Sequence, residues 1–241
     1  MSRTVRSLLR TSTALFGLLA GLMAGSPAFA QGALVTGADA AFAAPAVSVV
    51  GAETLAPGER ALVVSAGLPD VEVGMLWGTS SMTDVLARLR FQYGRGVRIA
   101  GGGITLGTTL RMRLASFSGW NLALTSDPEL TLHILGSDHP PTSKTGPVAF
   151  GVTPLAGGVV LDRMLLPEVR LALAVQTGVG FFIAPDTVVS VPISVGIAVE
   201  SKLAESMWLF ARIDTGYDLY GPGGIPGSDV LLRARLGLSF L

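Results

Sequence analysis

The sequence contains no cysteine, little charge and almost no lysine. Without cysteine the chain can form neither a disulfide bond nor a thiolate metal site. Charged residues make up 14% of the chain and hydrophobic residues 49%, whereas a soluble domain usually carries about 25% charged residues. Lysine occurs only at Lys144 and Lys202. This composition indicates that much of the folded surface faces a non-aqueous neighbour.

Long hydrophobic runs are also missing outside the N-terminus. No stretch of about 18 uninterrupted apolar residues follows residue 30, so membrane-spanning helices are not expected. An apolar chain without spanning helices leaves two options. One is a protein with a large buried core, and the other is a β-barrel in lipid.

The N-terminus has the pattern of a secretory signal peptide. Three arginines precede a short apolar stretch at residues 14–24, and Ala28-Phe29-Ala30 forms an A-x-A cleavage site before Gln31. We therefore expect residues 1–30 to be removed during export. No cysteine follows the cleavage site, so a lipid-anchored form is excluded. The mature chain then has a net charge of about −3, which is not the basic footprint of a nucleic-acid-binding protein.

Residues 31–59 are rich in alanine, glycine and proline and show only a weak pattern. We interpret them as a flexible lead-in. A plug inside the lumen of a barrel is the alternative interpretation of this segment.

From residue 60 to residue 241 the sequence alternates with a period of two between turn clusters, which is typical of β-strands. Ten strands are expected if the segment around Asp127-Pro128 is one bent strand, and eight is the alternative number. The expected strands cover residues 61–67, 71–78, 84–94, 104–116, 120–136, 153–162, 168–183, 188–202, 207–220 and 229–241. Short and longer connections alternate, which favours an all-β fold, a closed antiparallel up-and-down transmembrane barrel.

Each expected strand has one apolar face and one face of small and polar residues. The apolar face carries residues such as Leu89, Leu110, Leu173 and Leu236. A soluble barrel or sandwich would bury this apolar face. Three features favour the opposite arrangement: the polar face is crowded with small residues, its charged residues are nearly all arginine, and strands of about eleven to fourteen residues can cross a bilayer. The residues expected to line the lumen are Arg88, Arg90, Arg111, Arg113, Arg170, Arg212, Asp214, Arg233, Arg235 and Glu200.

One residue conflicts with a regular barrel. Pro192 lies within an expected strand, and proline cannot donate a hydrogen bond to a neighbouring strand. We expect a bulge or a local kink at this position.

The signal peptide, the alternating strands and the last strand, LLRARLGLSFL, resemble small bacterial outer-membrane barrels of the OmpA, OmpX and OmpW type. In that group the final strand ends on an aromatic residue that the barrel-insertion machinery reads, and here Leu236, Leu238 and Phe240 have the matching spacing. The pattern departs at Leu241, because the aromatic residue is penultimate. The resemblance implies an outer-membrane location, contact with lipid and a porin-like architecture. We expect a monomer.

No catalytic, cofactor or metal motif stands out. His133 and Ser137 lie four residues apart, or about 13 Å along a strand, which is too far for a nucleophile and its base. His139 falls in a loop, and Glu200, Asp214 and Asp218 do not have calcium-loop spacing. We therefore expect neither an enzyme nor a cofactor.

The charges on the expected lumen face lead to two hypotheses about the lumen. Eight arginines share this face with fewer matching acids, which are Asp84, Glu129, Glu200, Asp214 and Asp218. A plugged lumen with an internal charge network is one hypothesis, and a thin anion-leaning passage lined by Arg111, Arg113, Arg233 and Arg235 is the other. The expected role is structural, a surface interaction or a narrow passage. A secreted soluble β-barrel or sandwich that binds an apolar ligand is the alternative.

Overall fold

The structure is a computed structural model, and it describes residues 48–93, 102–134, 148–184, 187–221 and 227–241. The predicted signal peptide, residues 31–47 of the lead-in, and His139 lie outside the described residues. The described residues all belong to one compact unit.

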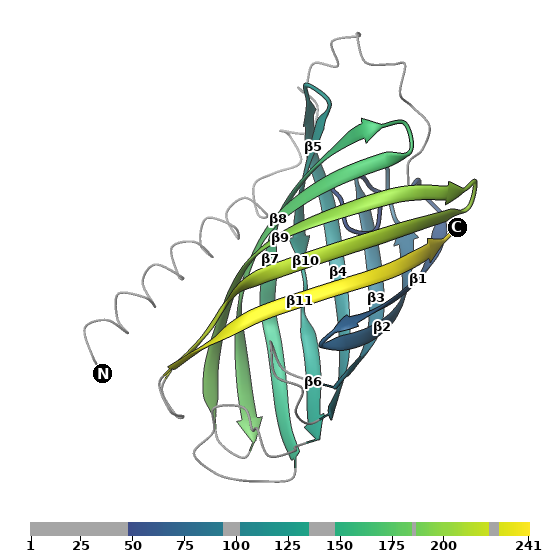
Figure 1. Cartoon of the computed structure of the whole chain (residues 1–241). Helices are drawn as coiled ribbons and strands as arrows, with labels where there is room; N and C mark the ends of the chain where they lie inside the picture. Colours follow the sequence, from purple (N-terminus) through teal and green to yellow (C-terminus); the bar gives the residue numbers. More distant parts are fainter. Residues whose placement is uncertain (1–47, 94–101, 135–147, 185–186, 222–226) are drawn as a thin grey trace. The chain divides into compact units, whose positions relative to one another are not determined.

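The described chain forms strands that pair with their sequence neighbours in antiparallel fashion (Figure 1). Pairing of the first strand with the last closes the sheet into a barrel. The strands are β1 (Arg60–Leu68), β2 (Asp70–Gly78), β3 (Thr83–Gln92), β4 (Gly102–Phe117), β5 (Trp120–Ser126), β6 (Glu129–Ile134), β7 (Val148–Leu166), β8 (Val169–Ala184), β9 (Val188–Ala204), β10 (Met207–Tyr220) and β11 (Gly227–Phe240).

Strands β5 and β6 together occupy one position in the barrel, because both pair with β4 on one side and with β7 on the other. They are separated at Asp127-Pro128, where Pro128 has no N–H for a strand ladder. The chain is nevertheless held there, because the Asp127 N–H donates to the Ala156 carbonyl at 2.8 Å. The expected ten-strand, closed, up-and-down barrel is confirmed.

A bulge or a local kink was expected at Pro192, and the structure shows no bulge there. The register between β8 and β9 is the same on both sides of this proline, but the pairing is interrupted between Ile193 and Ser190. Pro192 thus removes ladder contacts without inserting a residue. A register shift occurs instead on β7, between Val152 and Leu155, next to the break between β5 and β6. Strand β7 is also longer at both ends than residues 153–162.

The two ends of the barrel differ in their connections. At one end, which we call the short-turn end, tight turns cover residues 79–82, 118–119, 167–168 and 205–206. At the other end, which we call the long-loop end, the paired ends of β3 and β4, of β6 and β7, and of β10 and β11 are separated by longer stretches of sequence that lie mostly outside the described residues. Strands β1 and β2, and strands β8 and β9, are separated there by only one and three residues. The alternation of short and longer connections agrees with the sequence pattern, and the two short links at the long-loop end depart from it.

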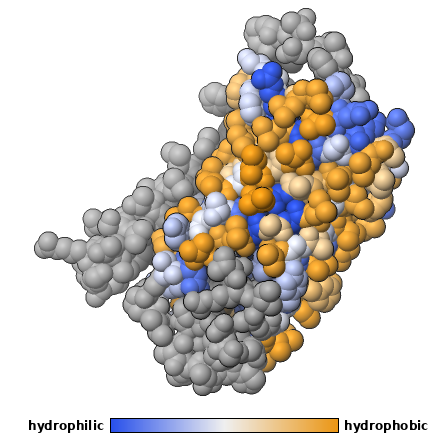
Figure 2. Space-filling view, in the orientation of Figure 1, coloured by the Kyte–Doolittle hydropathy of each residue, from blue (hydrophilic) through white to orange (hydrophobic). Residues whose placement is uncertain are grey.

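Alternate residues of each strand point outward or into the barrel. On β10, for example, Ile213 and Tyr217 are exposed, whereas Asp214 and Asp218 between and beside them are buried. Hydrophobic residues cover much of the outer wall in view (Figure 2). The barrel is therefore apolar outside and polar inside.

Candidate functional site

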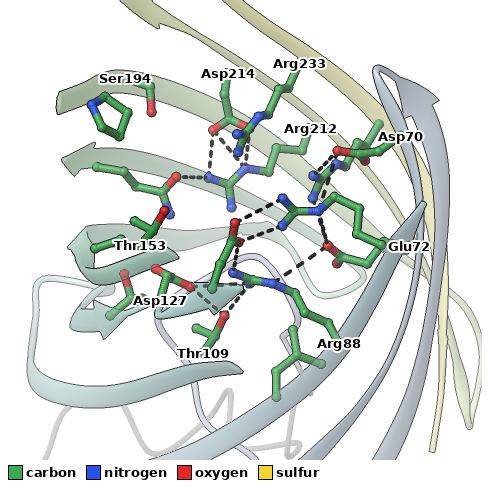
Figure 3. Close-up of a pocket in the computed structure, with 18 of the residues that line it drawn as sticks. Asp70, Glu72, Arg88, Thr109, Asp127, Thr153, Ser194, Arg212, Asp214 and Arg233 are labelled. Carbon is green, nitrogen blue, oxygen red and sulfur yellow. Dashed lines mark hydrogen bonds and ion pairs between the residues drawn. The ribbon is translucent and has the colours of Figure 1, made fainter. Parts of the chain in front are cut away.

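The inner wall of the barrel encloses a cavity of about 280 Å³. At the short-turn side its lining includes Val49, Val50 and Gly51, which precede the first strand. At the long-loop side the lining includes Gln92 and His133. Between them lie the charged side chains of β2, β3, β10 and β11 (Figure 3).

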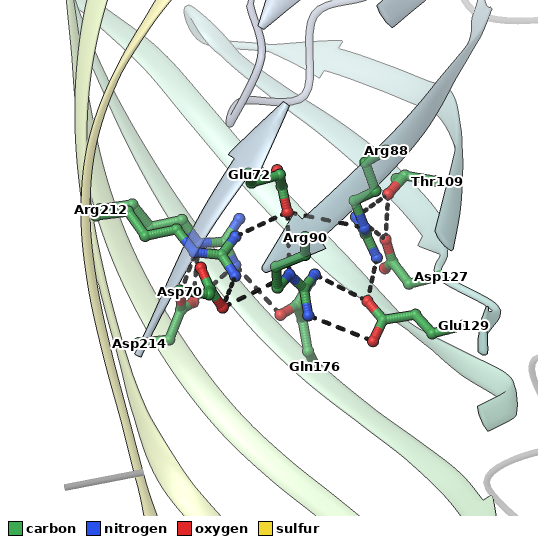
Figure 4. A network of polar contacts seen from close by, with 11 residues as sticks. Asp70, Glu72, Arg88, Arg90, Thr109, Asp127, Glu129, Gln176, Arg212 and Asp214 are labelled. Atoms are coloured by element: carbon green, nitrogen blue, oxygen red, sulfur yellow. Dashed lines mark hydrogen bonds and ion pairs between the residues drawn. The ribbon is translucent and has the colours of Figure 1, made fainter. Parts of the chain in front are cut away.

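An arginine–carboxylate network crosses the cavity (Figure 4). We define it as Asp70, Glu72, Arg88, Arg90, Asp127, Glu129 and Arg235. At its centre Glu129 accepts hydrogen bonds from Arg88 Nη2 at 2.5 Å and from Arg90 Nη2 at 2.9 Å. Arg90 also donates from Nε to Glu72 at 3.2 Å, and Arg88 lies 3.4 Å from Asp127.

Arg235 of β11 joins this network from the side of β2 that faces away from β3. The Arg235 guanidinium bonds Asp70 at 2.8 Å and Glu72 at 3.3 Å. On β10, Arg212 binds Asp214 at 2.7 Å and donates to Gln176 of β8 at 3.2 Å. A charge in a barrel interior is costly without a partner, and these contacts supply the partners.

A second group of charged residues lies at the short-turn end and binds the segment before β1. We call residues 48–56 the plug segment, and Asp84, Arg111, Asp162, Arg170 and Glu200 the plug-binding cluster. Within this cluster Glu200 accepts hydrogen bonds from the Ser48 hydroxyl at 2.6 Å and the Val49 N–H at 2.7 Å.

The remaining members of the cluster bind the plug segment mainly through its backbone. Asp162 accepts from the Ala52 N–H at 2.6 Å, and Asp84 accepts from the Leu55 N–H at 3.3 Å. Arg111 donates to the carbonyl oxygens of Ser48 and Gly51, both at 2.7 Å. The backbone groups of an irregular segment thus find partners inside the barrel, where water cannot serve them all.

Arg170 is the most enclosed member of the plug-binding cluster. Its side chain is fully buried and contacts Glu200 at 3.3 Å and Asp162 at 3.6 Å, and it also bonds Glu53 of the plug segment. Burial raises the pKa of the Glu53 carboxyl above its usual value, and the positive charge of Arg170 opposes that rise.

Small residues of the wall make room for the plug segment. Val50, Ala52 and Leu55 are buried in a cluster whose wall side combines five alanines with five larger apolar residues. The alanines are Ala61, Ala123, Ala172, Ala174 and Ala198, and the larger residues are Val63, Leu76, Leu86, Val160 and Phe210. The small inner face was expected to mark a narrow lumen, but here it leaves space for a second segment. Residues 48–56 are partly or fully buried within the barrel and hydrogen-bond to its wall, which fits the alternative interpretation of this segment as a plug inside the lumen, whereas Pro57 and Gly58 are exposed.

The residues that the sequence analysis expected to line the lumen lie in three places. Arg88, Arg90, Arg111, Arg212, Asp214, Arg233 and Arg235 border the cavity. Arg170 and Glu200 lie buried against the plug segment. Arg113 lies at the short-turn end, where it donates to the Ser81 carbonyl at 3.1 Å.

Sequence reasoning missed several inward carboxylates, so the expected excess of arginine is wrong for the described residues. On that part of the chain the buried or cavity-lining carboxylates outnumber the guanidinium groups. The missed acids are Asp70, Glu72, Asp127 and Asp162. A signal for two of them was available, since Asp70 and Glu72 alternate with outward-facing Val71 and Val73.

Within the described ranges, no group of three or more histidine, aspartate or glutamate side chains is arranged to hold a metal ion. In the same part of the chain, no helix is long and apolar enough to cross a lipid bilayer. The site described above consists of two sets of charged side chains and the polypeptide segment that one set binds.

The sequence matches no protein-family model and no curated protein.

Proposed function

We propose that this chain is an integral outer-membrane β-barrel whose lumen is closed at the short-turn end by its own N-terminal segment. The observation that carries the proposal is the distribution of polarity across the wall. Ile213 is 52% exposed on the outside of β10, whereas its neighbour Asp214 points inward and binds Arg212. A protein in water would favour the opposite arrangement.

The exposed apolar surface is too extensive for an ordinary soluble protein. Large hydrophobic side chains are exposed on every strand of the described barrel except β5. Soluble monomers rarely expose contiguous apolar patches larger than a few hundred Å². In a bilayer this surface contacts lipid, and the closed ladder leaves no strand edge without a partner.

Aromatic residues gather on the outer wall near both ends of the barrel, as in outer-membrane proteins. Phe91, Tyr93, Phe150 and Tyr217 lie toward the long-loop end, and Trp77, Phe117, Trp120 and Phe240 toward the short-turn end. Tyr217 is ten residues from Met207, the residue that pairs with Phe240. At about 3.3 Å per residue and a tilt of about 40°, this spacing gives about 25 Å across the wall, the height of the apolar band of such barrels.

The last strand suits recognition by the barrel-insertion machinery. Leu236 and Phe240 of β11 are exposed on the outer wall, and Leu238 shares their face. An incoming chain could present this apolar, aromatic-ended face before the barrel closes on β1.

The role that best fits the closed lumen is structural or a surface interaction through the long-loop end. A secreted barrel that binds an apolar ligand is the weaker candidate, because charged and hydrogen-bonding groups line the described cavity. An anion-leaning passage is also weaker, because Arg111 and Arg235 both bind carboxylates.

A matched pair of arginine substitutions tests the membrane location. Ile213 and Ile134 are 52% and 53% exposed on the outer wall, but Ile213 lies between the two aromatic groups and Ile134 is the last residue of β6. In lipid, Ile213→Arg should cost about 2–4 kcal/mol of folding free energy, and Ile134→Arg less than about 1 kcal/mol. Equilibrium unfolding in guanidinium chloride, with lipid vesicles present, measures both.

A soluble barrel predicts a different result, since two equally exposed isoleucines should tolerate arginine equally well. Equal free energies for the two variants, together with a native protein that stays folded and monomeric without detergent, would reject the outer-membrane proposal.

A further inference from the structure

We propose that the plug segment is removable and that the barrel conducts cations once this segment leaves the lumen. The proposal rests on the outer-membrane function above, and it adds an activity and a charge preference to it.

The plug segment can leave without breaking the barrel wall. The strand ladder begins at Arg60, and the contacts of residues 48–56 to the wall are side-chain hydrogen bonds, ion pairs and apolar packing. A turn at residues 57–59 connects the segment to β1. Gly58 in that turn has a φ of 85°, a conformation that glycine adopts without strain.

The plug segment separates the cavity from the short-turn end. Val49, Val50 and Gly51 form part of the cavity lining, and Ala52 and Leu55 of the same segment are buried in one cluster with alanines and larger apolar residues of the wall. If the segment leaves, the vacated space is bordered by alanines such as Ala172 and Ala198 together with larger apolar side chains such as Leu86 and Phe210. The cavity then continues toward the short-turn end.

The charges exposed by this change favour cations. Withdrawal of the plug segment frees the oxygens of Asp84, Asp162 and Glu200 that now accept its N–H and O–H groups. Arg111 and Arg170 are the guanidinium groups among them. Rings of carboxylates are the usual lining of cation-selective pores, so the expected preference is opposite to the one that the arginine count suggested.

Gly51 offers a way to displace the plug segment without changing the wall. A Cβ atom at this position would lie 2.2 Å from Asp162 Oδ2 and 2.5 Å from Ser48 Oγ. Gly51→Val should therefore force the segment out of its binding site. Gly102→Val is the matched control, because a Cβ atom there would meet its nearest neighbour at 3.7 Å, on a strand end far from the plug segment in sequence.

Planar-bilayer recordings on the full mature chain test the proposal, with potassium chloride at two concentrations across the bilayer. Gly51→Val should raise the open fraction about tenfold or more, the shift that about 1.4 kcal/mol of overpacking produces. Its reversal potential should have the sign of cation preference. The native protein and Gly102→Val should both remain mostly closed.

A cysteine in the plug segment reports its release separately. The chain has no cysteine, and Ala52 is fully buried, so Ala52→Cys introduces one protected thiol. A membrane-impermeant maleimide should label this thiol slowly alone and at least about tenfold faster when Gly51→Val is also present. If Gly51→Val does not assemble, Ser48→Val removes the hydroxyl contacts to Glu200 and Gly51 and takes its place.

The outcomes separate the two proposals. A labelled thiol in a barrel that stays closed would overturn the conducting role, and so would an anion preference. A thiol that stays protected in both plug variants would overturn the removable plug. Failure of the native chain to insert into vesicles would instead overturn the outer-membrane function.

Discussion

The two halves of the lumen contain the same charged residue types, but the carboxylates and guanidinium groups find different hydrogen-bonding partners in each half. At the short-turn end, carboxylates and guanidinium groups bind the backbone of the plug segment. Toward the long-loop end, the arginine–carboxylate network pairs side chain with side chain beside a cavity. The same strand faces supply both sets, so what a charged residue does here depends on what covers it.

The halves also differ in their access to water. Arg170 and Glu200 are 0% and 1% exposed, whereas the Arg235 side chain is 13% exposed. Asp70 Oδ1 and Arg235 Nε have no protein partner among the described residues, and both side chains border the cavity. A polar cavity of this size can hold bridging water. The plug-binding cluster should therefore tolerate the loss of a charge less well than the network does.

The largest expected effect comes from removing one arginine in each half. Arg170→Met leaves Asp162 and Glu200 buried without their guanidinium partner, and should cost about 3–5 kcal/mol. Arg235→Met leaves carboxylates that Arg90 still contacts and water can reach, so its cost should be smaller. Unfolding in guanidinium chloride with detergent micelles compares the two. A larger loss for Arg235→Met would contradict the proposed difference between the halves.

A medium effect is expected from the centre of the network. Glu129→Gln keeps the shape of the side chain but removes the charge that Arg88 and Arg90 share. We expect a loss of about 1–3 kcal/mol in the same unfolding assay. Glu205→Gln, on a side chain that is 98% exposed at a short turn, is the control and should leave the stability unchanged. If the two variants behave alike, the network does not stabilise the barrel.

The barrel itself could be predicted from the sequence because one physical rule repeats in every strand. Alternation of residues such as Leu171, Leu173 and Val175 with Ala172 and Ala174 defines a wall with two faces, whatever the loops do. Counting the alternating segments gives the number of strands, and Pro128 marks the place where one of them bends. Closure is expected because every segment has the same two faces. Pro192 was harder to judge, because the neighbouring strand decides whether a lost hydrogen bond produces a bulge or only a gap.

The plug segment could not be predicted in the same way. Residues 48–56 have no period, because an irregular segment inside a barrel is held by partners far away in the sequence. Ser48 and Glu200, for example, are 152 residues apart. The sequence feature that points to the plug segment is found in the wall. Asp162 and Glu200 face the lumen and need hydrogen-bond donors, and the small alanines beside them leave room for the segment that supplies those donors.

The smallest expected effect concerns Glu53, the acid of the plug segment itself. Burial raises the pKa of its carboxyl, so the bound plug segment favours the protonated form. Because protonation and binding are linked, binding of the segment is strongest below the ordinary carboxyl pKa of 4.5 and weakens as the pH rises through the raised pKa. Glu53→Gln should remove this part of the pH dependence while changing the overall stability by less than about 1 kcal/mol, because burial and the Arg170 ion pair oppose each other. Maleimide labelling of Ala52→Cys with and without Glu53→Gln, compared at each pH from 5 to about 8, measures the difference. The quantity compared is the labelling rate of the protein with Glu53 divided by the rate of the Glu53→Gln variant at the same pH. If this ratio is the same at every pH, or is highest at the acidic end, ionisation of Glu53 does not weaken the binding of the plug segment.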